Sequence, residues 1–108
     1  MKRFLCVFAS SGMLATIQEE VEIIEFWVFF GRPGDRREYI VHPRASLQAC
    51  PGSFRLLCRH TVHPTVSVHG TRFRRVDRRT IDVFSDVGDY RLFFDHVYDA
   101  LAFWYSIR

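Results

Sequence analysis

Arginine side chains offer most of the chemistry in this sequence. The chain carries 15 basic residues, of which Lys2 is the only lysine, against 12 acidic residues. A guanidinium group suits phosphate because its planar fork donates two parallel hydrogen bonds. Two clusters have the density that an anion site needs. The first contains Arg32, Arg36 and Arg37, and the second contains Arg72, Arg74 and Arg75.

The second cluster raises the possibility of nucleic-acid binding, since Phe73 lies among the arginines as a stacking residue would. Alternation along a strand places Arg72 and Arg74 on one face and Phe73 and Arg75 on the other. Asp77 interrupts the run, and the net charge of +3 is small for a basic nucleic-acid surface. We therefore expect these arginines to form the solvated rim of a hairpin, with nucleic-acid binding as the less favoured alternative.

Cysteine and histidine side chains are too loosely spaced to indicate a metal site. The chain has no Cys-x-x-Cys pair, and its three cysteines, Cys6, Cys50 and Cys58, form no even disulfide framework. We expect reduced thiols in a cytosolic compartment, because the N-terminal apolar stretch is a poor signal peptide. A zinc site would have to be gathered from Cys50, Cys58, His60, His63 and His69. We therefore expect no metal.

Catalytic motifs are also missing from the sequence. It has no Gly-x-Ser-x-Gly elbow, no phosphate loop with a lysine and no His-Glu-x-x-His helix. A Cys/His pair such as Cys58 and His60 is too common to identify a nucleophile. The prediction is a noncatalytic protein without a cofactor.

The elements that position these residues are mostly strands. A chain of 108 residues with 48% hydrophobic content fits one domain. Residues 17–30 predict a long strand, 31–35 a turn, and 36–42 the returning strand of a hairpin. Short strands are expected at 45–49, 54–58, 65–69 and 71–76. A second hairpin is expected from 80–84 and 90–94.

The period changes after Phe94 and predicts a helix over 95–107. Apolar residues recur there at three and four positions, which indicates one buried stripe of Val97, Tyr98, Leu101, Trp104 and Tyr105. Asp95 is the expected N-cap. An antiparallel sheet closed by one helix is an α+β, mainly β, arrangement.

The order of these elements resembles a pleckstrin homology (PH) domain. The matches are Phe26–Phe30 followed by a basic loop and Arg36–Val41, then Gly52–Leu56, the last hairpin, and a helix whose Trp104 and Ile107 are similar to the family's Trp-x-x-Ile signature. The resemblance implies a bent, seven-stranded antiparallel sandwich or barrel capped by a C-terminal helix. It also implies that Trp104, supported by Leu101 and Ile107, plugs the open end.

The resemblance also implies a site for phosphoinositides beside the first hairpin, but this sequence departs from the pattern. Phe29 and Phe30 stand where a lysine is wanted, and Glu38 precedes Tyr39 where an arginine is wanted. A carboxylate there repels phosphate. Weak attraction of Arg32, Arg36 and Arg37 to an anionic membrane is the remaining lipid expectation.

A protein partner is therefore the leading expectation, with the domain acting as a scaffolding or adaptor module. The 17 Phe, Trp and Tyr residues are more than a small core readily hides, and exposed ones mark interaction sites. We assign the PH-like domain to residues 17–108 and leave 1–16 as a leader or an extra strand. The expected location is cytoplasmic, and peripheral attachment to a membrane or to the cytoskeleton is the alternative.

Overall fold

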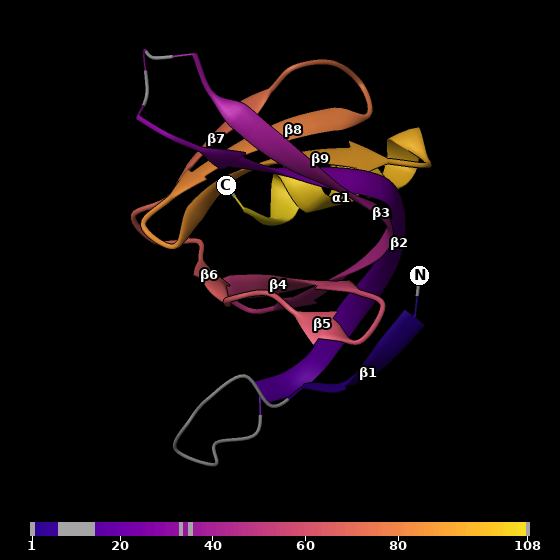
Figure 1. Ribbon diagram of the computed structural model, residues 1–108. Coiled ribbons are helices and arrows are strands. Elements are labelled where there is room, and N and C mark those ends of the chain that lie inside the picture. Colours follow the sequence, from indigo (N-terminus) through magenta and orange to yellow (C-terminus); the bar gives the residue numbers. More distant parts are fainter. Residues whose placement is uncertain (1, 7–14, 33, 35, 108) are drawn as a thin grey trace.

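The computed structural model describes residues 2–6, 15–32, 34 and 36–107, with side chains from residue 20 onward. These residues form one antiparallel sheet and one C-terminal helix, a mainly β arrangement (Figure 1). The elements are β1 (Lys2–Cys6), β2 (Ala15–Phe30), β3 (Glu38–Cys50), β4 (Ser53–Cys58), β5 (Thr61–Val62), β6 (Val66–Ser67), β7 (Arg72–Arg75), β8 (Thr80–Ser85), β9 (Gly88–Phe94) and α1 (Val97–Ser106).

The strands follow a continuous path in the order β5-β4-β3-β2-β9-β8-β7, while β1 pairs with β2 and β6 pairs with β4. Neighbours on the path pair antiparallel. Within the described residues the two ends of the path do not pair with each other, so the expected barrel is not closed. The path has seven strands, as the resemblance implied, but they are not all the predicted ones. The predicted strand at 65–69 contains β6, which lies off the path, whereas β5, which ends the path, was not predicted.

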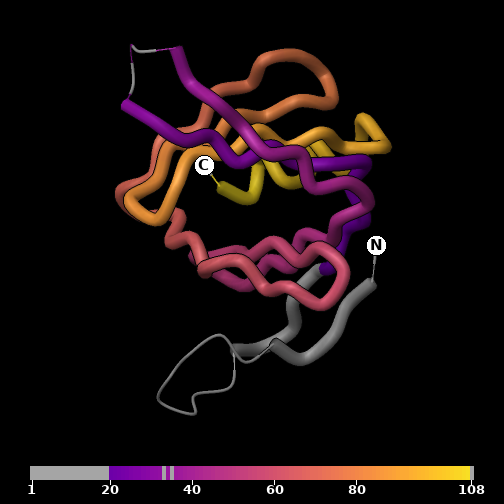
Figure 2. The backbone as a smooth tube through the Cα atoms, viewed as in Figure 1, coloured from indigo at the N-terminus to yellow at the C-terminus, as the bar shows by residue number. Residues whose placement is uncertain are grey.

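The sheet has two arms: one contains β7, β8 and β9, and the other contains β4, β5 and β6 (Figure 1). The two longest strands, β2 and β3, curve from one arm to the other (Figure 2). The sequence suggested two separate strands at 36–42 and 45–49, but β3 runs through both. A proline followed by Arg44 in the left-handed region (φ 52°) lies between them. Proline removes a ladder donor and a left-handed residue turns the chain, so the strand bends without ending.

The hydrophobic core lies between the two arms and beneath α1. Its largest side chains with almost no exposure are Phe26, Phe54, Phe94, Leu47 and Leu56. Phe103 of α1 contacts three of the core phenyl rings, Phe54 at 5.2 Å, Phe94 at 5.6 Å and Phe73 at 6.2 Å between centroids. The helix therefore joins both arms, because Phe54 belongs to β4 and Phe94 to β9.

The helix is confirmed, but its buried stripe was predicted one position away from where it lies. Ala100 and Phe103 are the buried residues, whereas Tyr98 is 83% exposed and Tyr105 is 63% exposed. Trp104 and Ile107 pack against the core from a half-buried position. Leu101 is also half-buried. Phe103 is therefore the aromatic residue of α1 that is buried, while Trp104 packs beside it at partial exposure.

The start of the helix also differs from the prediction. The helix begins at Val97 and its N-cap is His96, which makes no side-chain capping bond. Asp95 lies one residue before the cap and is exposed. Asp99 in the first turn still has the favourable sign for the helix dipole.

Candidate functional site

The first half of β3 is an open edge of the sheet. β3 pairs with β2 along almost its full length, from Glu38 to Ala49, but pairs with β4 only from Ala45 onward. Over 38–43, among the described residues, the strand therefore has a ladder partner on one side alone. We call residues 38–43 the open edge.

Large apolar side chains cover both faces of the open edge. Tyr39, Ile40 and Val41 are 47%, 50% and 43% exposed, and Phe30 at the end of β2 is 48% exposed. Natural edge strands are protected by charges, bulges or a covering segment, because an exposed apolar edge recruits another strand. Glu38 and Pro43 protect the two ends of this edge, whereas Tyr39, Ile40 and Val41 between them leave an apolar stretch of the kind to which an extended chain can add.

The direction of the free backbone groups follows from Pro43. Its carbonyl oxygen accepts a hydrogen bond from the Cys58 thiol at 3.4 Å, and Cys58 belongs to β4, on the side of β3 away from β2. Backbone polar groups alternate in direction along a strand. Tyr39 and Val41 therefore direct their N–H and C=O groups away from β2, and the donor that Pro43 lacks is an outward one.

Stacked aromatic rings support the open edge on the outer face of the sheet. Trp27 stacks on Tyr39 with centroids 4.3 Å apart and an interplanar angle of 13°. Phe93 lies 4.9 Å from Trp27, and Phe29 lies 5.6 Å from Tyr39. Contacts of this kind between strands stabilise both the sheet and the ring positions. We call these four rings, Trp27, Phe29, Tyr39 and Phe93, the aromatic platform.

A buried carboxylate extends this platform across β9, β8 and β7. Asp82 is 3% exposed and accepts hydrogen bonds from Arg91 at 2.6 and 3.0 Å and from Arg74 at 2.6 Å. Arg91 also lies over the Trp27 ring at 5.8 Å. Burial raises the pKa of the Asp82 carboxyl, but the bonds from the two arginines outweigh it and hold the pKa below its usual range.

The first arginine cluster is divided by the structure. Arg37 forms a salt bridge with Asp89 at 2.8 Å and lies over the Phe29 ring at 5.5 Å. Arg32 and Arg36 are exposed. Arg36 and Arg37 line one hollow together with Glu38 and Tyr39, but Arg37 is already paired with a carboxylate and Glu38 adds a second one.

The second cluster is divided as well, along the faces that alternation predicted. Arg72 and Arg74 are exposed on the outer face, where both lie over the Phe84 ring, at 5.7 and 5.6 Å. Phe73 packs on the core, and Arg75 shares its face at half exposure. A shallow depression of about 380 Å³ brings Arg37 and Arg72 together, but Asp89 also lines it.

Two histidines line the inner face behind the open edge. His42 stacks on Phe26 at 4.8 Å, and the His63 ring lies 4.8 Å from His42 and 4.9 Å from Phe26. Burial and the neighbouring His42 lower the pKa of His63. Both effects favour the neutral form of the His63 ring over its charged form.

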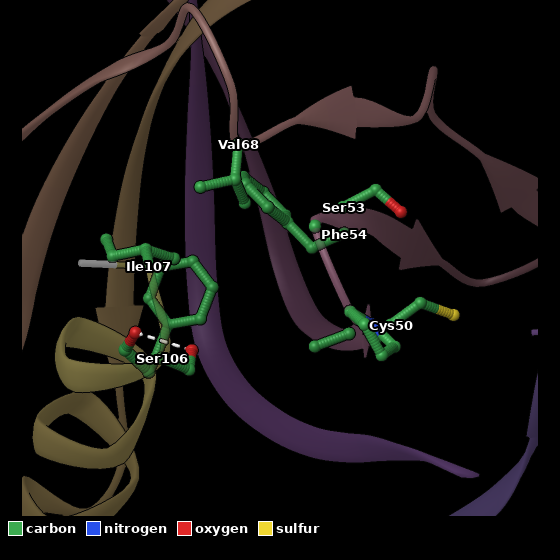
Figure 3. Close-up of a pocket in the computed structure, with 10 residues that line it drawn as sticks. Cys50, Ser53, Phe54, Val68, Ser106 and Ile107 are labelled. Carbon is green, nitrogen blue, oxygen red and sulfur yellow. Dashed lines mark hydrogen bonds between the residues drawn. The ribbon is translucent and has the colours of Figure 1, made fainter. Parts of the chain in front are cut away.

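An apolar pocket of about 240 Å³ lies between the β3–β4 turn and the end of α1 (Figure 3). Cys50, Ser53 and Phe54 line one side, and Ser106 and Ile107 line the other. Ser106 turns its hydroxyl to the carbonyl of Phe103 at 2.8 Å. The ten lining residues include no charged side chain, so the pocket is not suited to a phosphate headgroup.

The candidate zinc ligands do not converge. Across 2–6, 15–32, 34 and 36–107, no group of three or more His, Cys, Asp or Glu residues is placed to hold a metal ion. Cys58 is a buried thiol, and His60 and His69 are exposed. The side chain of Cys6 lies outside the described residues. No helix in the described part of the chain has the length and apolar character to cross a membrane.

The open edge is the feature that sequence reasoning missed. A continuously apolar run such as Tyr39-Ile40-Val41 is typical of a strand that is covered on both faces, so the local sequence carried no signal of an open edge. The aromatic residues did indicate exposure, since Phe30, Tyr39, Tyr98 and Tyr105 are all more than 40% exposed. No protein-family model matches the chain, and no curated protein or solved structure is significantly similar to it.

Proposed function

We propose that the protein is a noncatalytic, PH-like interaction module of the cytoplasm that binds another protein as a scaffold or adaptor. The observation that carries this proposal is the open edge at 38–43, where outward backbone groups lie beside exposed Tyr39, Ile40 and Val41. A strand added to such an edge gains affinity from main-chain hydrogen bonds and specificity from alternate side chains.

The architecture supports the PH-like part of the proposal. A bent antiparallel sheet with a single helix at its C-terminal end supplies the parts that such a domain requires. The helix places an aromatic side chain, Phe103, between the two arms of the sheet. An apolar plug of this kind leaves the edges and hairpin tips of the sheet available for partners.

The charges favour a protein partner over a membrane or a nucleic acid. Arg37 is paired with Asp89, and Arg74 and Arg91 share the single negative charge of Asp82. The exposed Glu38 stands within the open edge itself. Binding to phosphate would require these arginines to leave their carboxylates, which weakens both the lipid and the nucleic-acid alternatives.

A capture experiment with the purified protein tests the proposal. The bait variants are Val41→Pro, which removes an outward donor without touching the β2 ladder, and Val41→Thr, which keeps the donor and the branched shape. Equal melting temperatures establish that both are folded. We expect a discrete, nuclease-resistant protein partner that Val41→Thr retains and Val41→Pro loses.

A liposome sedimentation assay on the same samples tests the membrane-binding alternative. Sedimentation with anionic vesicles alone, abolished by Arg32→Ala with Arg36→Ala, would contradict the protein-binding function. So would a partner whose capture falls steeply with salt and depends on Arg72 and Arg74, because that behaviour indicates phosphate contacts.

A further inference from the structure

We infer that the partner seated on the open edge is a second copy of this chain, added antiparallel so that the two sheets become continuous across a two-fold axis at Val41. The inference rests on the proposed function because it names the partner of the same edge. Three properties of residues 38–44 carry it: the direction of the backbone groups, the order of the charges and the distribution of the apolar side chains.

The backbone groups of the open edge are complementary to themselves. Antiparallel pairing about Val41 places Tyr39 opposite Pro43 of the second copy and Val41 opposite its own equivalent. The outward N–H of Tyr39 then meets the outward C=O of Pro43, and the Val41 groups bond each other. Four hydrogen bonds form, and none requires the donor that Pro43 lacks.

The charges at the two ends of the edge have opposite signs. Glu38 is exposed where the edge begins, and Arg44 is exposed where it ends. Pairing about Val41 places each Glu38 opposite Arg44 of the other copy. Moving the axis to Ile40 would instead place Arg36 opposite Arg44, which is repulsive. The charges therefore select the Val41 axis.

The apolar side chains of the edge also match across this axis. On the outer face, Tyr39 meets Pro43 and Val41 meets Val41, beside the Trp27 ring that already stacks on Tyr39. On the inner face, Ile40 meets His42. Pairing thus covers Tyr39, Ile40 and Val41, which are 43% to 50% exposed in the single chain.

The strand β7, at one end of the strand path, does not offer the same match. β7 ends the strand path, and its sequence is Arg72-Phe73-Arg74-Arg75. Antiparallel self-pairing there would bring arginines together, and like charges opposite each other destabilise a pair. The other copy is therefore expected on β3 and not on β7.

Sedimentation velocity over a concentration series tests the dimer. The six-residue open edge spans about 20 Å and gives an interface at the small end of the range, so we expect a dissociation constant on the order of 10 μM. The protein should change from monomer to dimer between about 1 and 200 μM. Val41→Thr should follow the same curve, and Val41→Pro should remain monomeric throughout.

Charge reversal tests the axis. Glu38→Arg should weaken the dimer at least tenfold, and Glu38→Arg combined with Arg44→Glu should recover most of the affinity because the attraction is restored with the signs exchanged. A folded Val41→Pro variant that still dimerises would overturn the inference. A Glu38→Arg variant that associates like the parent would overturn the Val41 axis.

The outcome also separates this inference from the function it rests on. A protein that stays monomeric at all concentrations, yet captures a different protein in a manner that Val41→Pro abolishes, refutes the dimer and leaves the module function in place. A monomer whose open edge captures nothing refutes both.

Discussion

The two halves of β3 belong to one strand but to two environments. In the second half, Ala45 and Leu47 are each 1% exposed, and the strand is paired on both sides. In the first half, Tyr39, Ile40 and Val41 are about half exposed, and the strand is paired on one side. The covered half stabilises the fold, whereas the open half carries apolar surface that the fold does not use.

The outer faces of the two halves differ in the same way. In the covered half, Gln48 receives a hydrogen bond from Arg55 at 2.7 Å and donates one to Glu20 at 3.5 Å, so a polar row crosses three strands. In the open half, Tyr39 stacks on Trp27. A polar row suits contact with water, while an aromatic row at an unpaired edge suits contact with another chain.

The strongest test of this comparison replaces one apolar residue in each half. Leu47→Ala should cost about 2–5 kcal/mol of unfolding free energy, because it leaves a cavity in the core. Ile40→Ala should cost less than about 1 kcal/mol, because the side chain is half exposed. Urea unfolding of dilute protein measures both. Equal losses would show that the open half is part of the core.

The Asp82 network is linked to the open half of β3. Asp82 holds Arg91, Arg91 lies over the Trp27 ring, and Trp27 stacks on Tyr39. Asp82→Asn removes the charge that Arg74 and Arg91 share and should cost about 1–3 kcal/mol at neutral pH. The depressed pKa of Asp82 means that its stabilising effect is present above about pH 4 and is lost as the pH falls through its folded value.

Thermal unfolding at a series of pH values gives the readout for Asp82. The curves of the parent and of Asp82→Asn should converge in acid, where the parent carboxyl is also neutral. A constant difference at every pH would assign the loss to packing and would contradict the charge network.

His63 gives the smallest expected effect, at the end of the open edge. Its lowered pKa means that the folded state resists protonation, so the stability is complete above about pH 6.5 and declines as the pH falls below that value. His63→Gln should flatten the stability profile between about pH 7 and pH 5. A profile unchanged by the substitution would show that the His63 ring is solvated and would contradict its burial against Phe26 and His42.

Much of the sheet was predictable from local pattern. The turn-forming residues 31–35 separated β2 from β3, and the alternation at 80–84 and 90–94 gave β8 and β9 close to their observed bounds. The helix followed from the change of period after Phe94. These elements share one property: the signal that defines them lies within a few neighbouring residues.

The features that sequence reasoning missed depend on distant partners. Whether Tyr39 is buried is decided by where β4 stops pairing with β3, which no residue near Tyr39 encodes. The helix shows the same limit, because Phe103 and Trp104 are adjacent and only the positions of Phe54 and Phe94 decide which one is buried. The division of the arginine clusters likewise depends on Asp82 and Asp89, carboxylates from other strands.

Amide hydrogen exchange along β3 tests the open edge most directly. Ile40 donates toward β2 and should be protected at every concentration, whereas the outward amides of Tyr39 and Val41 should exchange rapidly in dilute protein and slow down on association. Protection of Tyr39 and Val41 at all concentrations would contradict the account, because it would mean that another part of the chain covers the edge. Rapid exchange of both at all concentrations would contradict the dimer.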